Sequence, residues 1–284
     1  MIKIHYSIRF CLTLIFLFFA SLPLFGQQTI SQDVLTGDDL LYRKEISGGG
    51  LIHTNGWGLA FRQSKINSIF KKTFKEYSFT VLKHPREVRQ QSPFTSANGG
   101  TGGYIFGKIN NFVGLSVSFG RAKVLASKAR RHGIEVSLLY AGGPSLGITK
   151  PYYLEIIENF VEDRIITRNV KYTPETAQYY TSSKDRIFCA SGLFYGLTEL
   201  RFHPGATGKM AVLFDWGKTH KTIKALEAGV SVQVHAALTR DKGQENSKLK
   251  IGAPPIMATN DDLSIKNKYL FTSLYLQLML GARK

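Results

Sequence analysis

The chain has 284 residues, with 37 Lys and Arg against 20 Asp and Glu, which gives a formal net charge of +17. It holds only two cysteines, Cys11 and Cys189. A fold held together by a framework of disulfides is therefore excluded.

The first 26 residues have the pattern of a secretory signal peptide. Lys3 and Arg9 precede the apolar run FCLTLIFLFFASLPLF at 10–25, which is shorter than the roughly 20 residues of a bilayer-spanning helix. We expect cleavage near Gly26; the alternative is a retained membrane anchor. The predicted domains are a signal peptide over 1–26, a periplasmic lead-in over 27–41 and a single β-barrel domain over 42–284.

Removal of this segment leaves 35 basic against 20 acidic side chains and a single cysteine, so no intrachain disulfide is expected. An exported basic protein meets no nucleic acid in its normal compartment. We therefore expect its acidic partner to be lipopolysaccharide phosphate or another envelope polyanion.

Alternating side chains predict β-strands along the mature chain. The pair Asn55-Gly56 predicts a tight hairpin turn between 42–53 and 57–62. The clearest central strand, 113–121, alternates Val, Leu, Val and Phe with Gly and Ser. The other predicted runs are 73–83, 104–108, 134–140, 146–155, 192–202, 210–216, 230–236 and 268–284.

The last run, KYLFTSLYLQLMLGARK at 268–284, is the most informative. One face carries Leu270, Thr272 and four further leucines, and the other carries Tyr, Phe, Ser, Gln and Met. A strand in a soluble sheet has about five or six residues, whereas a membrane-spanning strand needs about nine to eleven. The length and the leucine face predict a strand that faces lipid.

These observations predict an all-β fold, an antiparallel transmembrane β-barrel of 10–12 strands. Eleven runs are visible, and a bacterial barrel with both termini in the periplasm needs an even number. Either a weak strand near 249–256 makes twelve, or two runs form one bent strand and make ten. We predict outward-facing long loops at 84–103, 122–133 and 156–187, and periplasmic turns at 109–112, 141–144 and 203–209.

Four segments resemble an uncharacterised family of outer-membrane β-barrel proteins of Bacteroidota. The resemblance implies this fold and a location in the outer membrane of a Gram-negative bacterium, and it transfers no catalytic residue. The segments are YRKEISGGGLIHTNGWGLAFR at 42–62, SLGITKPYYLEI at 145–156, KALEAGVSVQV at 224–234 and PIMATNDDLSIKNKYLFTSLYLQLMLG at 255–281.

The best acid–base set that the sequence offers is His235 with Ser231 and Gln233 on one inward face and Asp215 one strand earlier. No GxSxG or HExxH motif is present, and no cofactor or metal is expected. Inward-facing charges are better explained as ion pairs that fill a closed lumen. We predict such charges at Arg62, Glu76, Glu135, Glu155, Glu199, Arg201 and Asp215.

One basic cluster, Lys123, Lys128, Arg130 and Arg131, lies in a predicted loop and would contact lipopolysaccharide phosphates if that loop is extracellular. The plainer alternative is a solvated charged loop. The favoured function is a non-enzymatic outer-membrane barrel that serves as a structural or docking component of an envelope assembly and contacts lipid, lipopolysaccharide and other envelope proteins. The alternatives are a barrel enzyme that modifies lipid or lipopolysaccharide, and a narrow channel for a small solute.

Overall fold

The computed structural model describes residues 43–284, except 69, 93–101, 128–132, 162–163, 182–184, 193, 218–220, 241–248 and 259–266. All of these residues belong to the unit Leu40–Lys284. The predicted signal peptide and lead-in lie outside the described residues. No described helix has the length and apolar character needed to cross a bilayer.

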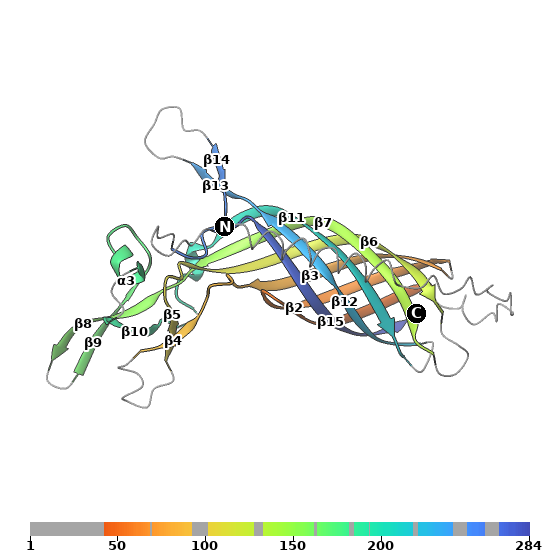
Figure 1. Cartoon of the computed structure of the whole chain (residues 1–284), viewed down its shortest axis with the longest axis horizontal. Helices are drawn as coiled ribbons and strands as arrows, with labels where there is room; N and C mark the ends of the chain where they lie inside the picture. Colours follow the sequence, from red (N-terminus) through yellow and green to blue (C-terminus); the bar gives the residue numbers. More distant parts are fainter. Residues whose placement is uncertain are drawn as a thin grey trace, which may run out of the picture. The chain divides into compact units, whose positions relative to one another are not determined.

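Eight of the described strands form one closed antiparallel barrel (Figure 1). Each barrel strand pairs with the barrel strands that precede and follow it along the chain, and β1 pairs with β15 to close the barrel. The barrel strands are β1 (Lys44–His53), β2 (Gly56–Ser68), β3 (Lys71–Leu82), β6 (Asn110–Ala126), β7 (Glu135–Pro151), β11 (Arg201–Asp215), β12 (Thr222–His235) and β15 (Leu270–Arg283).

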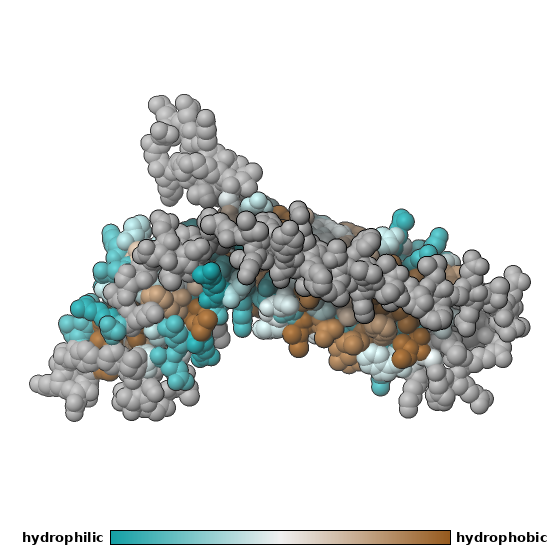
Figure 2. Space-filling view, in the orientation of Figure 1, coloured by the Kyte–Doolittle hydropathy of each residue, from teal (hydrophilic) through white to brown (hydrophobic). Residues whose placement is uncertain are grey.

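The alternation predicted for the last strand is confirmed in β15. Its leucines point out of the barrel, with Leu274 63% exposed, whereas Tyr275 and Met279 point inward and are buried. The pattern in β6 is confirmed as well, because Leu115 and Phe119 face outward and Gly114 and Ser118 face inward. Figure 2 shows apolar side chains gathered on the barrel wall.

The predicted Asn-Gly hairpin joins β1 to β2. Gly56 has φ +147°, and a Cβ at this position would lie 2.0 Å from the carbonyl oxygen of Val81. Any side chain at position 56 would therefore collide with β3. The turn also contacts β15, since the Asn55 amide donates to Ser273 Oγ at 2.9 Å.

The prediction of 10–12 strands is wrong, because two pairs of predicted runs are single strands. The predicted turns at 141–144 and 203–209 lie inside β7 and β11, and 109–112 leads into β6. Glycines in these stretches permit close approach of neighbouring strands: a Cβ on Gly143 would lie 2.0 Å from Val117 O. Small, tightly curved barrels use glycine in this way, so these glycines do not mark chain reversals.

One further run, and the weak strand expected near 249–256, do not contribute to the barrel. The predicted strand at 104–108 overlaps β5 (Gly103–Ile105), which pairs with β4 (Arg89–Gln91) outside the barrel. A strand does lie near 249–256, namely β14 (Leu249–Gly252), but it pairs with β13 (Ala237–Arg240) and not with the barrel. These differences bring the eleven predicted runs to eight barrel strands.

The two ends of the barrel differ. At one, here called the terminal end, lie Lys44, Lys284 and the connections 69–70, 127–134 and 216–221. At the other, the loop end, lie the turn 54–55 and the longer connections 83–109, 152–200 and 236–269. The segment 122–133, predicted to share one side with 84–103 and 156–187, is therefore at the opposite end from them.

The longer connections carry secondary structure of their own, here called the loop-end module (Figure 1). The region 156–187, predicted as a loop, contains strands and a short helix that share a core with β5: Tyr104, Leu154, Ile156, Val170, Tyr180 and Ile187. Besides β4, β5, β13 and β14, the module comprises β8 (Leu154–Val161), β9 (Arg164–Val170), α3 (Ala177–Thr181), β10 (Ile187–Ala190) and the 3-10 turn η2 (Leu197–Glu199).

Candidate functional site: the lumen and the loop-end module

The centre of the lumen holds a balanced network of two cations and two carboxylates. Arg62 on β2 donates to Glu76 on β3 and to Glu227 on β12. Lys209 on β11 bridges the same carboxylates, with its Nζ 3.0 Å from Glu227 Oε1. The Tyr275 hydroxyl adds a third donor to Glu227. Buried charges are tolerable when they are paired and hydrogen-bonded. These four charged side chains can therefore fill the centre of the lumen.

A second network fills the terminal end of the lumen. Lys72 Nζ lies 2.7 Å from Glu135 Oε1 and 3.2 Å from Glu45 Oε1. Arg283 reaches Glu45 at 2.8 Å and Asp215 at 2.7 Å. Strands β1, β3, β7, β11 and β15 are thus tied together next to the C-terminus.

Three histidines occupy the lumen towards the loop end. His235 is fully buried, and its ring lies edge-on to Phe112 with 5.1 Å between centroids. His203 Nε2 is 2.9 Å from the Thr149 hydroxyl. Each of these rings, and that of His53, has one buried nitrogen without a hydrogen-bond partner among the described residues. This layer is polar yet contains no described carboxylate.

An apolar cap closes the loop end above the histidines. Ile256 and Met257 are buried against Leu82, Phe112 and Phe271. Asn267 holds them, because its side chain accepts from both backbone amides at 3.0 Å and donates to Met257 O at 2.8 Å. This apolar cluster therefore occupies the loop end of the lumen.

The predicted acid–base set is not assembled. Gln233 and His235 face inward as expected, but Asp215 pairs with Ala225, while His235 pairs with Gly205 at the far end of β11. Ten positions along β12 correspond to about 33 Å. Within the described part of the chain, no cluster of three His, Cys, Asp or Glu side chains has the arrangement of a metal site.

The predicted lumen charges are partly confirmed. Arg62, Glu76, Glu135 and Asp215 lie in the two networks. Glu155, Glu199 and Arg201 do not, since Glu155 and Glu199 lie in the loop-end module and Arg201 is exposed. Sequence reasoning missed Glu45, Lys72, Lys209, Glu227 and Arg283.

Of the four predicted lipopolysaccharide contacts, one lies among the described residues. Lys123 lies on β6 near the terminal end, is exposed, and pairs with Lys71 on β3. Lys128, Arg130 and Arg131 fall outside the described residues.

The loop-end module contains the single described cysteine. Cys189 Sγ lies 3.0 Å from Glu155 Oε2, and burial together with this carboxylate raises the pKa of the thiol to about 12. Burial is also the main reason that the pKa of Tyr152 rises to about 12. Its hydroxyl accepts from the Ile105 amide at 3.0 Å and so joins the barrel rim to β5. Both groups keep their protons at neutral pH, and the Cys189 thiol donates to Glu155.

A closed antiparallel barrel with an apolar outer wall and a lumen filled by paired charges defines the class of this protein as a small β-barrel of the membrane type. No protein-family model matches the chain, and no curated protein matches it.

Solved structures give weak likenesses. Ail, the attachment invasion locus protein of Yersinia pestis, is 10% identical, with a TM-score of 0.38, over 86% of this chain and 99% of Ail. Ail in complex with the heparin analogue sucrose octasulfate gives a TM-score of 0.37 at 10% identity, over 85% of this chain and 97% of that one. Neisserial surface protein A gives 0.29 at 10% identity, over 85% and 94%. Scores this low add nothing to what the barrel itself shows.

Proposed function

We propose that this protein is a non-enzymatic integral barrel of the outer membrane of a Gram-negative bacterium. The observation that carries the proposal is the outward-facing apolar side chains on the barrel strands, among them Leu59, Phe79, Leu115, Met210 and Leu276, which are 36% to 58% exposed. An apolar surface that surrounds a whole barrel is unfavourable in water and favourable in hydrocarbon. A closed barrel also leaves no unpaired backbone groups in lipid.

The wall carries tryptophans near both ends, as expected for membrane interfaces. Trp57 is the second residue of β2 at the loop end and is 49% exposed, and Trp216 follows β11 at the terminal end and is 41% exposed. The wall between them would span the apolar region of the bilayer.

We further propose that the loop-end module faces outward and docks another envelope component. Long loops of such barrels are extracellular and short turns are periplasmic. The module has a core of its own, and it exposes Phe194 at 84%, Tyr195 at 51% and Leu197 at 49%. Aromatic side chains are enriched at protein interfaces.

The filled lumen argues against the channel alternative, since paired charges and the cap occupy it. The separation of Asp215 from His235 removes the main support for the enzyme alternative. The predicted contact of Lys123, Lys128, Arg130 and Arg131 with lipopolysaccharide phosphate stays a prediction. With the loop end outward, Lys123 would face the periplasmic leaflet.

Membrane fractionation and pull-down from detergent test the proposal together. We expect the protein in the outer-membrane fraction, released only by detergent, with a heat-dependent shift on a denaturing gel and no conductance in planar bilayers. A partner in fixed stoichiometry should co-purify with the wild type and be lost in Phe194→Ser/Leu197→Ser. Solubility without detergent would contradict the membrane proposal, and absence of a partner would contradict the docking role.

A further inference from the structure

The outer wall of the terminal end carries a dense basic patch across β1, β2, β3 and β6. Its side chains lie on the outward face of their strands, and strand pairing brings them together: Lys44 pairs with Lys65, Lys71 pairs with Lys123, and Lys65 and Arg121 both pair with Thr73. The patch consists of Lys44, Lys65, Lys71, Lys75, Arg121 and Lys123.

Among the described residues, no side-chain carboxylate pairs with the patch; the Lys284 carboxyl group accepts from the Lys44 backbone amide at 2.9 Å. The described acids of this end, Glu45, Glu135 and Asp215, face the lumen and are paired there. None of the six patch cations makes an ion pair with a described residue. Like charges directly opposite each other on neighbouring strands are destabilising. An external anion would offset the repulsion within the two Lys–Lys pairs.

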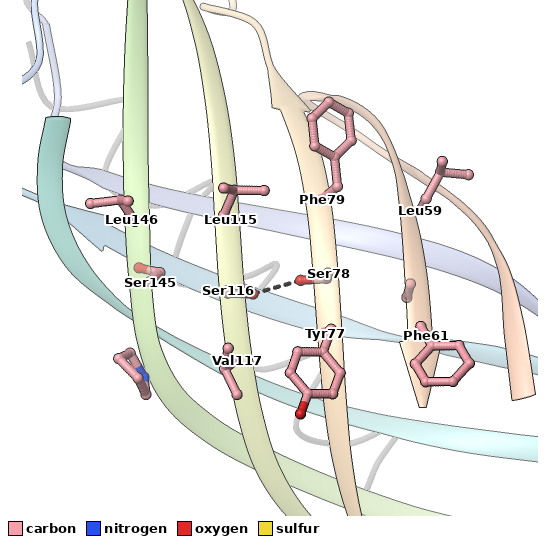
Figure 3. A pocket seen from close by; sticks show the side chains of 12 residues that line it. Leu59, Phe61, Tyr77, Ser78, Phe79, Leu115, Ser116, Val117, Ser145 and Leu146 are labelled. Atoms are coloured by element: carbon pink, nitrogen blue, oxygen red, sulfur yellow. Dashed lines mark hydrogen bonds between the residues drawn. The ribbon is translucent and has the colours of Figure 1, made fainter. Parts of the chain in front are cut away.

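Lys75 joins this patch to the apolar wall. Its Nζ lies 5.5 Å from the Tyr77 ring centroid and 5.3 Å from that of Phe119, which holds the ammonium at the edge of the aromatic surface. Directly above it, towards the loop end, begins a groove of about 570 Å³ between two rows of outward side chains. Phe61, Tyr77 and Val117 form the near row, and Leu59, Phe79 and Leu115 the far row (Figure 3).

A cationic patch that borders an apolar groove fits a ligand with a phosphate at one end and an acyl chain at the other. We propose that this wall binds an anionic phospholipid of the periplasmic leaflet, with its headgroup on the six basic side chains and an acyl chain in the groove. Basic residues at a membrane surface attract anionic headgroups in this way. The inference rests on the proposed function, because it requires the wall to be embedded in a bilayer with the terminal end facing the periplasm.

The test uses the full mature chain folded into phosphatidylcholine vesicles, with the unfolding midpoint measured as phosphatidylglycerol is added. We expect the midpoint to rise with phosphatidylglycerol and the rise to shrink at high salt. The variant Lys65→Gln/Lys123→Gln removes one lysine from each Lys–Lys pair. Its apparent affinity for phosphatidylglycerol should fall about 30-fold, which is about fivefold for each basic residue. This variant should be at least as stable as the wild type in pure phosphatidylcholine.

The matched control is Lys221→Gln/Lys224→Gln, which removes two exposed charges near the same end on and beside β12. It should keep the wild-type response. Equal losses in both variants, or no preference for phosphatidylglycerol, would overturn the inference.

Two further ligands distinguish the source of the phosphate. A larger rise with lipopolysaccharide through the same two lysines would overturn the assignment to phospholipid, and an equal rise with inorganic phosphate would overturn the acyl-chain contact. Failure to enter phosphatidylcholine vesicles at all would instead count against the proposed function. Insertion without any lipid preference would count against this inference alone.

Discussion

Glu227 shows how single residues hold the centre of the lumen. It is fully buried and accepts from Arg62, Lys209 and Tyr275 on three different strands. Glu227→Gln would leave two buried cations facing Glu76 alone. Removing one partner of a buried ion pair costs about 3–5 kcal/mol, so we expect a loss of this size in the free energy of unfolding from vesicles.

Glu158→Gln is the control for that measurement. Glu158 pairs with Arg168 at 3.5 Å in the loop-end module, where about half of each side chain is exposed. Exposed pairs contribute little, so this variant should unfold like the wild type. Equal stability of the Glu227→Gln variant would show that the lumen network does not hold the barrel.

Cys189 permits a chemical test of the loop-end module. Because its pKa is raised to about 12 by burial and by Glu155, almost no thiolate exists at neutral pH. Labelling of the folded protein by a maleimide should be slow at pH 7 and should still increase about tenfold per unit of pH between pH 8 and 10. Mass spectrometry measures this rate.

The carboxylate is the part of this environment that mutation can remove. Glu155→Gln should lower the Cys189 pKa and accelerate labelling, and the unfolded chain should label quickly. A rate that reaches its plateau near pH 8.5 in the folded wild type would contradict the proposed environment.

At the scale of the element, Asn267 is the side chain that contacts both Ile256 and Met257 of the cap. Asn267 makes three hydrogen bonds to Ile256 and Met257, which close the mouth of the barrel. Asn267→Ala should leave the barrel folded and lower the free energy of local opening of 253–258 by about 1–3 kcal/mol. Hydrogen exchange would show faster exchange of the Ala258 amide, which donates to Gly107 O at 2.7 Å. Asn67→Ala, an exposed position, should change nothing there.

The elements also show what could be predicted from the sequence. The alternation in β6 and β15 predicts which face of each strand meets lipid, because that property depends only on near neighbours in the chain. Strand number was not predictable in this way, because Gly142, Gly143 and Gly205 read as turn residues unless the curvature of the closed sheet is known. Glu227 pairs with residues far along the chain, so its role appears only once the register is fixed.

At the scale of the whole molecule, the proposals depend on which end of the barrel faces out. Both described ends of the barrel domain lie at the terminal end, together with the connections 69–70, 127–134 and 216–221. In outer-membrane barrels this end is periplasmic.

Cysteine labelling tests this orientation. With Cys189→Ser as the background, Glu175→Cys reports the loop end and Lys123→Cys reports the terminal end. We expect a membrane-impermeant maleimide to label only Glu175→Cys on intact cells and both variants after lysis. Labelling of Lys123→Cys on intact cells would show that the barrel has the opposite orientation. The basic patch would then lie in the leaflet that holds lipopolysaccharide.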